Sequence, residues 1–435
     1  MKIREHFTVL LLLFFVNASI IAQSDITISG SVVDAINNEP LSFATVSLKK
    51  QMIGIITNES GYFDLRVPAN LTDDSLVISY FGYKTQTFSL KTVSSPLNVR
   101  LKQTSVALNE IIVKPQPPEF YIKLAILCAK SNYPNEPFQT EAYYREKILE
   151  NKNFLKCNEG IFKTYCPNYL DTVKNQNQLL LFRQEENIHE IEFMAKERKE
   201  AEEKEQKKIA KQNEKNQKKG VAPVQKPGKQ NNLAIDMAGS MGGPSAILSM
   251  GSIKGSSNDF LDTASFKNYK YTFAKATSFN NSDLMVIDFK SKGKVEHVRS
   301  NGKIYIDVAS YAIVKVESNG DFIIPVLIRP ILFLYGFGIE NPTFHSVTEY
   351  QQIQRRWYPK NIQYNININI SNKHLFSPDE HSDFLIEGIY TVNKTRIDNV
   401  SAIPTAKRFN PDKEMKPQVH NDGGITWDGI NIIKK

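Results

Sequence analysis

The sequence is poor in the residue types that most catalytic and metal sites need. It contains three cysteines, seven histidines and two tryptophans in 435 residues. No Gly-x-Ser-x-Gly turn, no His-Glu-x-x-His helix motif and no phosphate loop ending in Gly-Lys-Ser/Thr occurs in the chain. These absences exclude the common serine hydrolase, zinc protease and P-loop classes. We therefore expect a protein that is not an enzyme and holds no cofactor or metal.

The only dense group of metal-ligand types joins His374 to Asp379, Glu380 and His381. Its spacing matches no helical histidine pair, and a Ser-Pro dipeptide in its middle indicates a turn. We predict a solvated loop here rather than a metal site.

The few cysteines leave two interpretations open. Cys157 and Cys166 lie close enough in sequence to close a short loop by a disulfide, which an oxidising compartment would permit. Alternatively all three thiols are buried and unpaired, with Cys128 on the apolar face of a predicted helix.

The N-terminus has the pattern of a secretory signal peptide. Lys2 and Arg4 precede a mostly apolar run over residues 7–21, and Ala22 offers a small residue for cleavage. An N-terminal membrane anchor is the alternative, but the run is short and polar residues follow at once. No cysteine lies near the cleavage point, so we do not expect a lipid-anchored lipoprotein. We predict an exported protein, periplasmic or associated with the outer membrane.

Positive charge is concentrated in one segment. Residues 194–229 carry twelve Lys or Arg and six Asp or Glu, a surplus of six within a formal net charge of +8. Interleaved acids and the lack of aromatics favour a solvated arm over a phosphate-binding surface. Together with export, this argues against nucleic acid as a partner.

Short strand-like runs separated by turn signals fill the region from residue 26 to residue 101. Seven such runs without a helix predict a β-sandwich. They cover residues 26–33, 44–48, 53–57, 62–67, 75–80, 84–90 and 97–101.

The motifs within these runs resemble the carboxypeptidase-regulatory-like domain, a transthyretin-like module. They are Gly30-Ser31-Val32-Val33-Asp34, Pro40-Leu41-x-x-Ala44-x-Val46, Thr57-Asn58-x-x-Gly61-x-Phe63-x-Leu65, Leu76-x-Ile78-Ser79-Tyr80-x-Gly82-Tyr83 and the exit strand Leu108-Asn109-Glu110-Ile111-Ile112-Val113. This module is common at the start of TonB-dependent transporters of the starch-utilisation type. The resemblance implies a structural module without zinc or catalytic groups.

The likeness to those transporters stops at the sandwich, because no plug domain or barrel pattern follows. A proline-rich linker leads to an amphipathic helix over residues 119–130. We expect its apolar face to consist of Tyr121, Leu124, Ala125, Leu127 and Cys128. Strands are predicted over residues 140–148 and 154–164, and residues 193–258 read as a disordered charged and Gly/Ser-rich insertion.

Strand patterns return at residue 269. Predicted strands cover residues 269–276, 283–290, 303–307, 312–318, 349–354 and 361–370. The last of these alternates isoleucine and tyrosine with polar residues, as in an antiparallel sheet with one wet face. The set Gly302–Asp307, Tyr311–Lys315 and Arg356–Lys360 is similar to an uncharacterised family of envelope proteins that begins with the same sandwich. The strand pattern also resembles the half-barrels of outer-membrane lipoprotein carriers.

The most apolar stretch of the mature chain covers residues 322–339, which include two prolines and one charge. The prolines argue against a membrane-spanning helix. A buried crossover on the sheet is one interpretation, and a lipid- or membrane-facing lip is the other. The lip would consist of Phe322, Ile324, Leu327, Leu332, Phe333 and Phe337.

The sequence thus predicts a mainly β protein in which a seven-stranded transthyretin-like sandwich precedes a larger antiparallel sheet domain with a short helix and a long disordered insertion. The expected divisions are a signal peptide (1–22), the sandwich (24–113), the helix and first strands of the second domain (118–192), the insertion (193–258) and the rest of the sheet (259–435). We expect a non-enzymatic envelope role, binding or scaffolding other envelope proteins or outer-membrane components. The alternative is a lipid or lipoprotein carrier with an apolar cavity in the second domain, and the third hypothesis is an envelope hydrolase.

Overall fold

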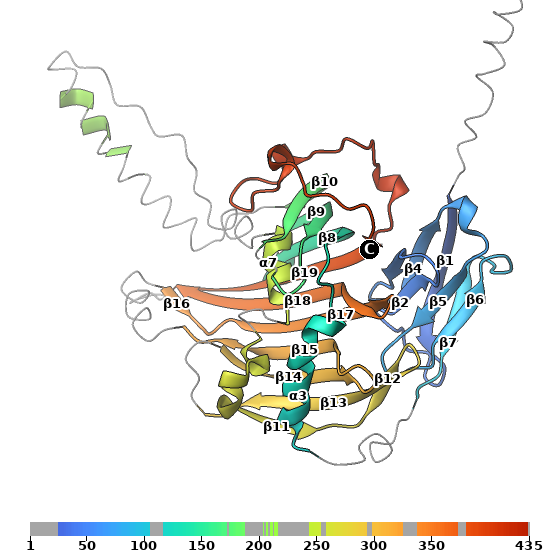
Figure 1. The fold of residues 1–435 in the computed structure, drawn as a ribbon. Coiled ribbons are helices and arrows are strands. Elements are labelled where there is room, and N and C mark those ends of the chain that lie inside the picture. The colour runs from blue at the N-terminus through green and yellow to red at the C-terminus, as the bar shows by residue number, and fades with distance from the viewer. Residues whose placement is uncertain are drawn as a thin grey trace, which may run out of the picture.

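The computed structural model of the chain describes residues 25–104, 116–171, 174–187, 243–253, 258–293, 298–324, 337–372 and 380–433, with isolated residues between 203 and 215. The described chain is mainly β, as predicted, with a small two-sheet sandwich beside one large antiparallel sheet (Figure 1). The predicted signal peptide and most of the predicted insertion lie outside the described residues.

All seven predicted strands of the sandwich are confirmed. They are β1 (Ile26–Asp34), β2 (Thr45–Leu48), β3 (Gly54–Ile56), β4 (Tyr62–Val67), β5 (Ser75–Ser79), β6 (Gln86–Ser89) and β7 (Leu97–Leu101), with the 3-10 helix η1 (Ala69–Leu71) before β5. One sheet has the order β4-β1-β7 and the other β3-β2-β5-β6. Alternate residues of each strand point between the sheets, so Val32, Val46, Leu65 and Ile78 are fully buried in the core.

The second sheet has twelve strands and continues through almost the whole remainder of the chain. Its strands are β8 (Phe138–Glu150), β9 (Asn153–Cys166), β10 (Gln176–Glu186), β11 (Tyr269–Phe273), β12 (Thr277–Phe279), β13 (Ser282–Ser291), β14 (Val298–Asp307), β15 (Ile313–Phe322), β16 (Phe337–Ile339), β17 (Thr343–Ile353), β18 (Arg356–Asn372) and β19 (Glu380–Arg396). The order is β10-β9-β8-β19-β18-β17-β15-β14-β13-β11, with β12 beside β13 and β16 beside β18.

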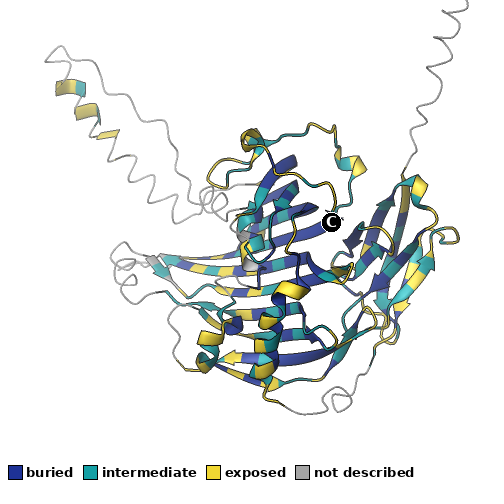
Figure 2. Ribbon diagram, viewed as in Figure 1, coloured by how far each residue is buried: buried dark blue, intermediate teal, exposed yellow. Residues whose placement is uncertain are grey.

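The two faces of this sheet differ in composition. Directly paired residues of antiparallel strands share a face, so the register assigns each side chain. On the face that we call the inner face, Ile304, Val316 and Ile362 belong to two large buried clusters. On the opposite, outer face, the same strands carry polar side chains such as Lys303, Glu317 and Asn365. Figure 2 shows the resulting alternation of buried and exposed residues along the strands.

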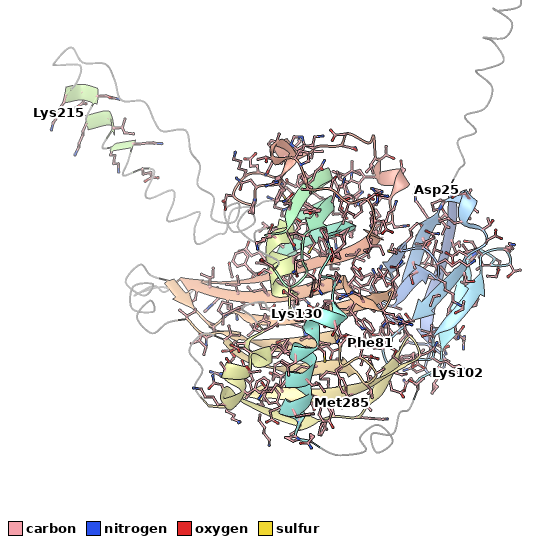
Figure 3. All side chains as sticks on the ribbon, viewed as in Figure 1. Asp25, Phe81, Lys102, Lys130, Lys215 and Met285 are labelled. Carbon is pink, nitrogen blue, oxygen red and sulfur yellow. The ribbon has the colours of Figure 1, made fainter. Side chains whose placement is uncertain are left out.

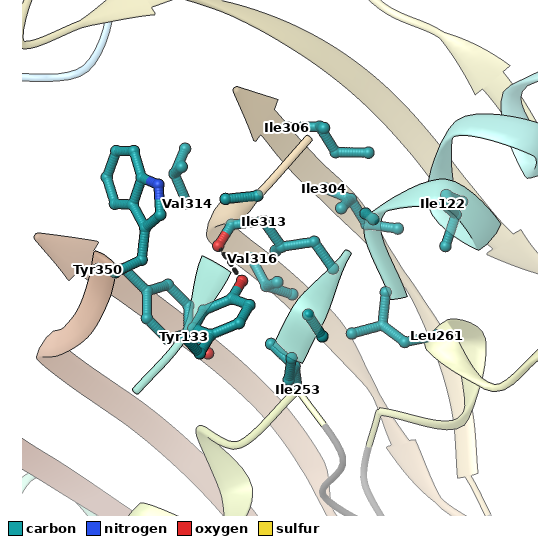
Figure 4. Close-up of a cluster of buried hydrophobic side chains, with 14 of the residues drawn as sticks. Ile122, Tyr133, Ile253, Leu261, Ile304, Ile306, Ile313, Val314, Val316 and Tyr350 are labelled. Carbon is teal, nitrogen blue, oxygen red and sulfur yellow. Dashed lines mark hydrogen bonds between the residues drawn. The ribbon is translucent and has the colours of Figure 1, made fainter. Parts of the chain in front are cut away.

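Short helices cover the inner face. Helix α3 (Pro118–Leu127) and the turn α4 (Ala129–Asn132) pack over β11 and β18, and α7 (Gly243–Met250) lies over β18 and β19. The 3-10 helices η3 (Asp259–Leu261) and η4 (Thr263–Asn268) follow α7, and η5 (Thr405–Lys407), η6 (Lys416–Gln418) and η7 (Trp427–Gly429) belong to the C-terminal segment. Figure 4 shows Ile122 and Leu261 packed near Ile304, and the Tyr133 hydroxyl donating to the Ile313 carbonyl at 2.6 Å. Among the described residues, no helix is long and apolar enough to cross a membrane.

Two sequence-based expectations about these helices are wrong. Leu127 was expected inside, but its side chain is 73% exposed, whereas Ile122 is fully buried. At 100° per residue Leu127 lies about 140° around the helix from Ile122, so it cannot share the inward face. The stretch expected to be disordered up to residue 258 contains α7, which Ile247 holds against the sheet with its buried side chain.

Four strands were not predicted from the sequence. They are the long strands β10 and β19 and the short strands β12 and β16. β19 lacks a simple alternation because both of its faces are buried near residues 388–393, where the outer face lies beneath the C-terminal segment and the sandwich. The loop expected at the Glu380-His381 pair is wrong for these two residues, which begin β19, while His374 and Asp379 lie outside the described residues.

Candidate ligand-binding cleft between the two domains

The sandwich is fastened to the outer face of the large sheet by an aromatic contact. The ring of Phe81, in the turn after β5, stacks on Phe279 of β12 with centroids 4.0 Å apart. The ammonium of Lys315 lies 4.5 Å from the centroid of the Phe81 ring, a cation–π contact. The amide of Gly82 donates to the Ser278 carbonyl at 2.9 Å. Figure 3 shows Phe81 at the boundary between the sandwich and the sheet.

A second contact joins the edge of the sandwich to the end of β19. Ile53 and Lys394 form an antiparallel bridge, and the Thr395 amide donates to the Met52 carbonyl at 3.2 Å. Main-chain hydrogen bonds of this kind fix the relative position of two elements more strictly than apolar contact alone. The domains therefore meet at two separate places on the outer face.

The C-terminal segment supplies a third connection. The side-chain amide of Asn431 accepts from the Arg66 amide at 2.7 Å and donates to the Arg66 carbonyl at 3.3 Å. The Asn393 side chain in turn donates to the Asn431 carbonyl at 2.6 Å. Ile433, nearby, is buried in a small apolar cluster with residues from both domains. Asn431 thus holds the main chain of the sandwich strand β4 as a neighbouring strand would.

Between these contacts the two domains leave a cleft of about 330 Å³. Clefts of this size between domains are the usual place of ligand sites. The sandwich contributes Phe43 and the turn after β3, and the outer face of β8, β9, β10 and β19 forms the other wall. The lining residues are Phe43, Asn58, Glu59, Ser60, Arg145, Lys147, Phe154, Cys157, Glu185, Glu387 and Ile433.

The Glu159 carboxylate, beside the cleft, already accepts hydrogen bonds from two neighbouring side chains. Arg183 donates to Glu159 at 2.6 Å, and the Tyr143 hydroxyl also donates to this carboxylate. Burial by itself would raise the pKa of Glu159, but these two hydrogen bonds outweigh burial and hold the pKa below its usual value. The Arg183 guanidinium also lies over the Trp427 ring, 4.5 Å from its centroid. Glu159, Arg183, Tyr143 and Trp427 thus hold one another in place, which favours a structural role over a catalytic one.

The two positively charged side chains that line the cleft differ in their ion pairs. Lys147 pairs with Glu387, with 3.4 Å between the charged atoms. Arg145, on the same strand and face, is half-buried and forms no ion pair with any described residue. The Glu159 carboxylate lies directly across the strands and Arg145 helps to keep its pKa low, but the hydrogen bonds of Glu159 go to Arg183 and Tyr143, so the donors of the Arg145 guanidinium stay available. Arg145 is therefore the group in the cleft best placed to receive an acidic group of a ligand.

The inner face offers much less room. A cavity of about 20 Å³, enough for about one water, lies under α7 among Thr164, Leu248, Ile362 and Tyr390. Helix α3 packs over β11 and α7 packs over β18 and β19. The cavity under α7 is thus too small for an acyl chain.

The residues predicted to face lipid are only partly described. Phe322 ends β15 and lies against Phe344, with ring centroids 5.0 Å apart, at the edge of an inner-face cluster. The Ile324 amide donates to the Asn341 side chain at 3.2 Å. Phe337 begins β16, whose backbone pairs with the end of β18. Leu327, Leu332 and Phe333 lie outside the described residues.

None of the three cysteines forms a disulfide with a described residue. Cys157 and Cys166 are both buried and lie on one strand, β9. Nine residues of extended strand separate them by roughly 30 Å, so the disulfide left open by the sequence is excluded. Burial raises the pKa of Cys166 to about 12, which makes it an unreactive thiol.

The sequence did not predict that the ionisable side chains of Glu146 and Lys360 are buried. Burial raises the pKa of Glu146, which accepts hydrogen bonds from Tyr364 at 2.9 Å and Tyr144 at 3.1 Å. Burial also lowers the pKa of Lys360 to about 7, against the opposing charge of Glu349. Neither residue lines the cleft between the two domains. No group of three or more potential metal ligands occurs among the described residues.

Comparison with known proteins identifies the first domain only. Residues 28–113 match the CarboxypepD_reg-like domain, which confirms the regulatory-like module expected from its motifs. No curated protein matches this chain.

Two solved structures show a distant likeness. One is a DUF1329 family protein from Desulfovibrio piger, with 9% identity, TM-score 0.22, and coverage of 66% of this chain and 96% of that chain. The other is a protein of unknown function from Bacteroides fragilis that its description associates with the membrane, with 12% identity, TM-score 0.15, and coverage of 86% and 98%. Both TM-scores are too low to carry an argument about fold or function.

Proposed function

We propose that this protein is a non-enzymatic binding protein of the bacterial cell envelope, and that its partner occupies the cleft between the sandwich and the large sheet. The observation that carries the proposal is Arg145, a half-buried guanidinium without an ion-pair partner among the described residues, in a cleft of about 330 Å³. The predicted signal peptide supports an envelope location, in the periplasm or at the outer membrane. The CarboxypepD_reg-like domain supports a structural role for the first wall of the cleft.

The rest of the cleft favours binding over catalysis. Its strongest carboxylate neighbour, Glu159, is held ionised by Arg183 and Tyr143, and Lys147 is paired with Glu387. A general acid or base needs a pKa near the working pH, whereas Arg183 and Tyr143 hold the pKa of Glu159 below its usual value. The expected partner is an envelope protein that places an acidic group beside Arg145.

A lipid or lipoprotein carrier is the weaker proposal. It would need α7 to leave the inner face, because the cavity beneath that helix has about 20 Å³. Native mass spectrometry of the purified protein tests it directly, since a carrier should retain lipid. An envelope hydrolase has no supporting geometry among the described residues.

Crosslinked pull-down from cells tests the proposed function. The wild-type chain should capture specific envelope partners, and Arg145→Ala should lose them. Lys270→Ala is a suitable control, because Lys270 is exposed on β11, at the far edge of the sheet, and its loss should change nothing. Equal capture by the Arg145 and Lys270 variants would overturn the proposal.

A further inference from the structure

The outer face of β18 carries asparagine where a strand normally avoids it. Asn365, Asn367 and Asn369 alternate with isoleucines that point to the inner face, and all three are exposed. Asparagine is depleted in strands, where threonine and other β-branched residues are preferred at solvated positions. The asparagines thus weaken the strand, and solvation alone does not require them. We call these three residues the amide row.

The amides of this row are largely available. No hydrogen bond to a described residue holds the Asn365 side chain. The Asn367 amide donates to the Thr343 hydroxyl at 3.4 Å, and the Asn369 amide donates to the Glu340 carboxylate at 3.3 Å, so each of these amides has one donor hydrogen engaged. Each amide carries two donor hydrogens and one acceptor oxygen, so all three retain capacity to bind a ligand that both donates and accepts.

The spacing of the row matches an extended polypeptide. Side chains two residues apart on a strand lie roughly 6.7 Å apart, and an extended chain laid along the strand repeats its peptide groups with the same period of two residues. The molecule already contains the corresponding contact. The Asn431 side chain holds both the N–H and the C=O of Arg66 in a strand of the sandwich. Three amides at this spacing could hold alternate peptide groups in the same way.

The row is continuous with the cleft. Asn365 is the direct cross-strand partner of Glu387, and Glu387 pairs with Lys147 on the next strand. Both of these charged residues line the cleft, and Arg145 lies two residues further along β8. A chain that runs along β18 from Asn369 to Asn365 therefore arrives at the mouth of the cleft.

The charges at the two ends of this path differ. At the far end, Asn369 pairs across strands with the exposed Asp383, and the carboxylate of Glu340 is also exposed. At the cleft end, Arg145 and Lys147 lie among the carboxylates of Glu59, Glu185 and Glu387, and the Arg145 guanidinium forms no ion pair with a described residue. The path covers roughly 22 Å, about seven extended residues. It suits a segment with a basic residue at one end and a carboxylate at the other.

Resting on the proposed function of the cleft, we propose that the partner is bound as an extended polypeptide segment, whose main chain is held by the amide row and whose acidic end enters the cleft. Recognition then depends on main-chain groups and end charges, and little on the side chains between them. When a peptide adds to a sheet edge, main-chain groups of the edge strand bind its main chain. Here side-chain amides on the face of the sheet would do so instead.

Isothermal titration calorimetry of the full chain with the octapeptide Lys-Thr-Thr-Thr-Thr-Thr-Thr-Glu tests this. The triple variant Asn365→Thr, Asn367→Thr, Asn369→Thr keeps or improves strand propensity while it removes the amides. It should lower the peptide affinity by about tenfold or more, since one net hydrogen bond corresponds to roughly that factor. The matched control Asn301→Thr changes an exposed asparagine on the same face three strands away, and it should leave the affinity unchanged.

Two N-methylated peptides sharpen the test. One carries methyl groups on the second, fourth and sixth amides, and the other on the third, fifth and seventh. Because the row contacts every second peptide group, one series should lose binding and the other should keep it. Equal binding by both series, equal binding by the triple variant, or displacement of the peptide by a neutral oligosaccharide would each overturn the inference.

The failure of this inference is distinguishable from that of the proposed function. If Arg145→Ala abolishes partner capture while the triple variant captures normally, the cleft binds a partner but not as an extended chain along β18. If Arg145→Ala has no effect on capture, the proposed function itself fails.

Discussion

Lys360 gives the stability of this protein an unusual dependence on pH. Its side chain is 3% exposed, and its ammonium donates one hydrogen bond, to the Val392 carbonyl at 2.7 Å. Burial disfavours the charged form and lowers the pKa from 10.5 to about 7, although the Glu349 carboxylate acts in the opposite direction. The unfolded chain therefore holds a proton on Lys360 between about pH 7 and pH 10.5, where the folded protein does not.

The sign follows from proton linkage. Stability rises with pH wherever the unfolded state binds more protons, so this group destabilises the fold fully below about pH 7 and progressively less as the pH rises toward 10.5. The full lowering of the Lys360 pKa corresponds to roughly 5 kcal/mol, and between about pH 6.5 and pH 9 the free energy of unfolding should rise by roughly 2 to 3 kcal/mol. Cys166, whose pKa is raised to about 12 by burial, opposes this rise from about pH 8.5 upward, and the buried tyrosines, whose pKa values are also raised by burial, oppose it above about pH 10.

Urea denaturation of wild type and of Lys360→Met at these two pH values measures the effect. The variant keeps the stem and loses the charge, so its free energy of unfolding should lack this rise and should exceed that of the wild type at pH 6.5. Lys270→Met, at an exposed position on β11, should retain the wild-type rise. A wild-type free energy that is flat from pH 6.5 to pH 9, or an equal rise in Lys360→Met, would refute the reasoning.

Three further predictions concern packing and covalent state. Phe81→Ala removes the stacking contact and the cation–π contact that fasten the sandwich, and should lower the free energy of unfolding by about 2 kcal/mol in urea denaturation; no change would mean that the contact does not hold the domains. A β-carbon on Gly388 would lie 2.2 Å from the Tyr364 ring, so Gly388→Ala should cost about 1 to 3 kcal/mol, and a thermal melt equal to wild type would contradict the close approach. All three thiols should react with iodoacetamide in the denatured, unreduced protein, and a mass showing only one alkylated cysteine would reveal a bridge.

The sandwich was predictable from the sequence because its elements are short and its turns are marked. Several turns between the strands contain Asn, Gly or Pro, and Gly61 and Gly82 adopt the positive φ that their turns require. Apolar residues alternate along strands such as β1, so core positions such as Val32, Val46, Leu65 and Ile78 could be assigned. The same rule located β18, whose isoleucines alternate with asparagines.

The cleft was not predictable in the same way. Arg145 belongs to a strand that the pattern identified, yet nothing local shows that its guanidinium faces a second domain. That position depends on the order of strands, which brings β8 beside β19 from the other end of the chain. The sequence pattern did not predict β10 or the buried part of β19. Where both faces of a strand are buried, polar and apolar residues no longer alternate. Tertiary contacts determine whether such residues are buried and which way they face. A local hydrophobic pattern in a single sequence does not show these contacts.

Site-specific photocrosslinking in living cells tests the central claim most directly. A photoreactive residue at Ser60, exposed at the rim of the cleft, should crosslink a defined envelope partner. The same residue at Thr87, exposed on β6 away from the cleft, should not. Adding Arg145→Ala should abolish the Ser60 product. Equal crosslinking from both positions, or a Ser60 product that persists without Arg145, would contradict a partner-binding cleft between the two domains.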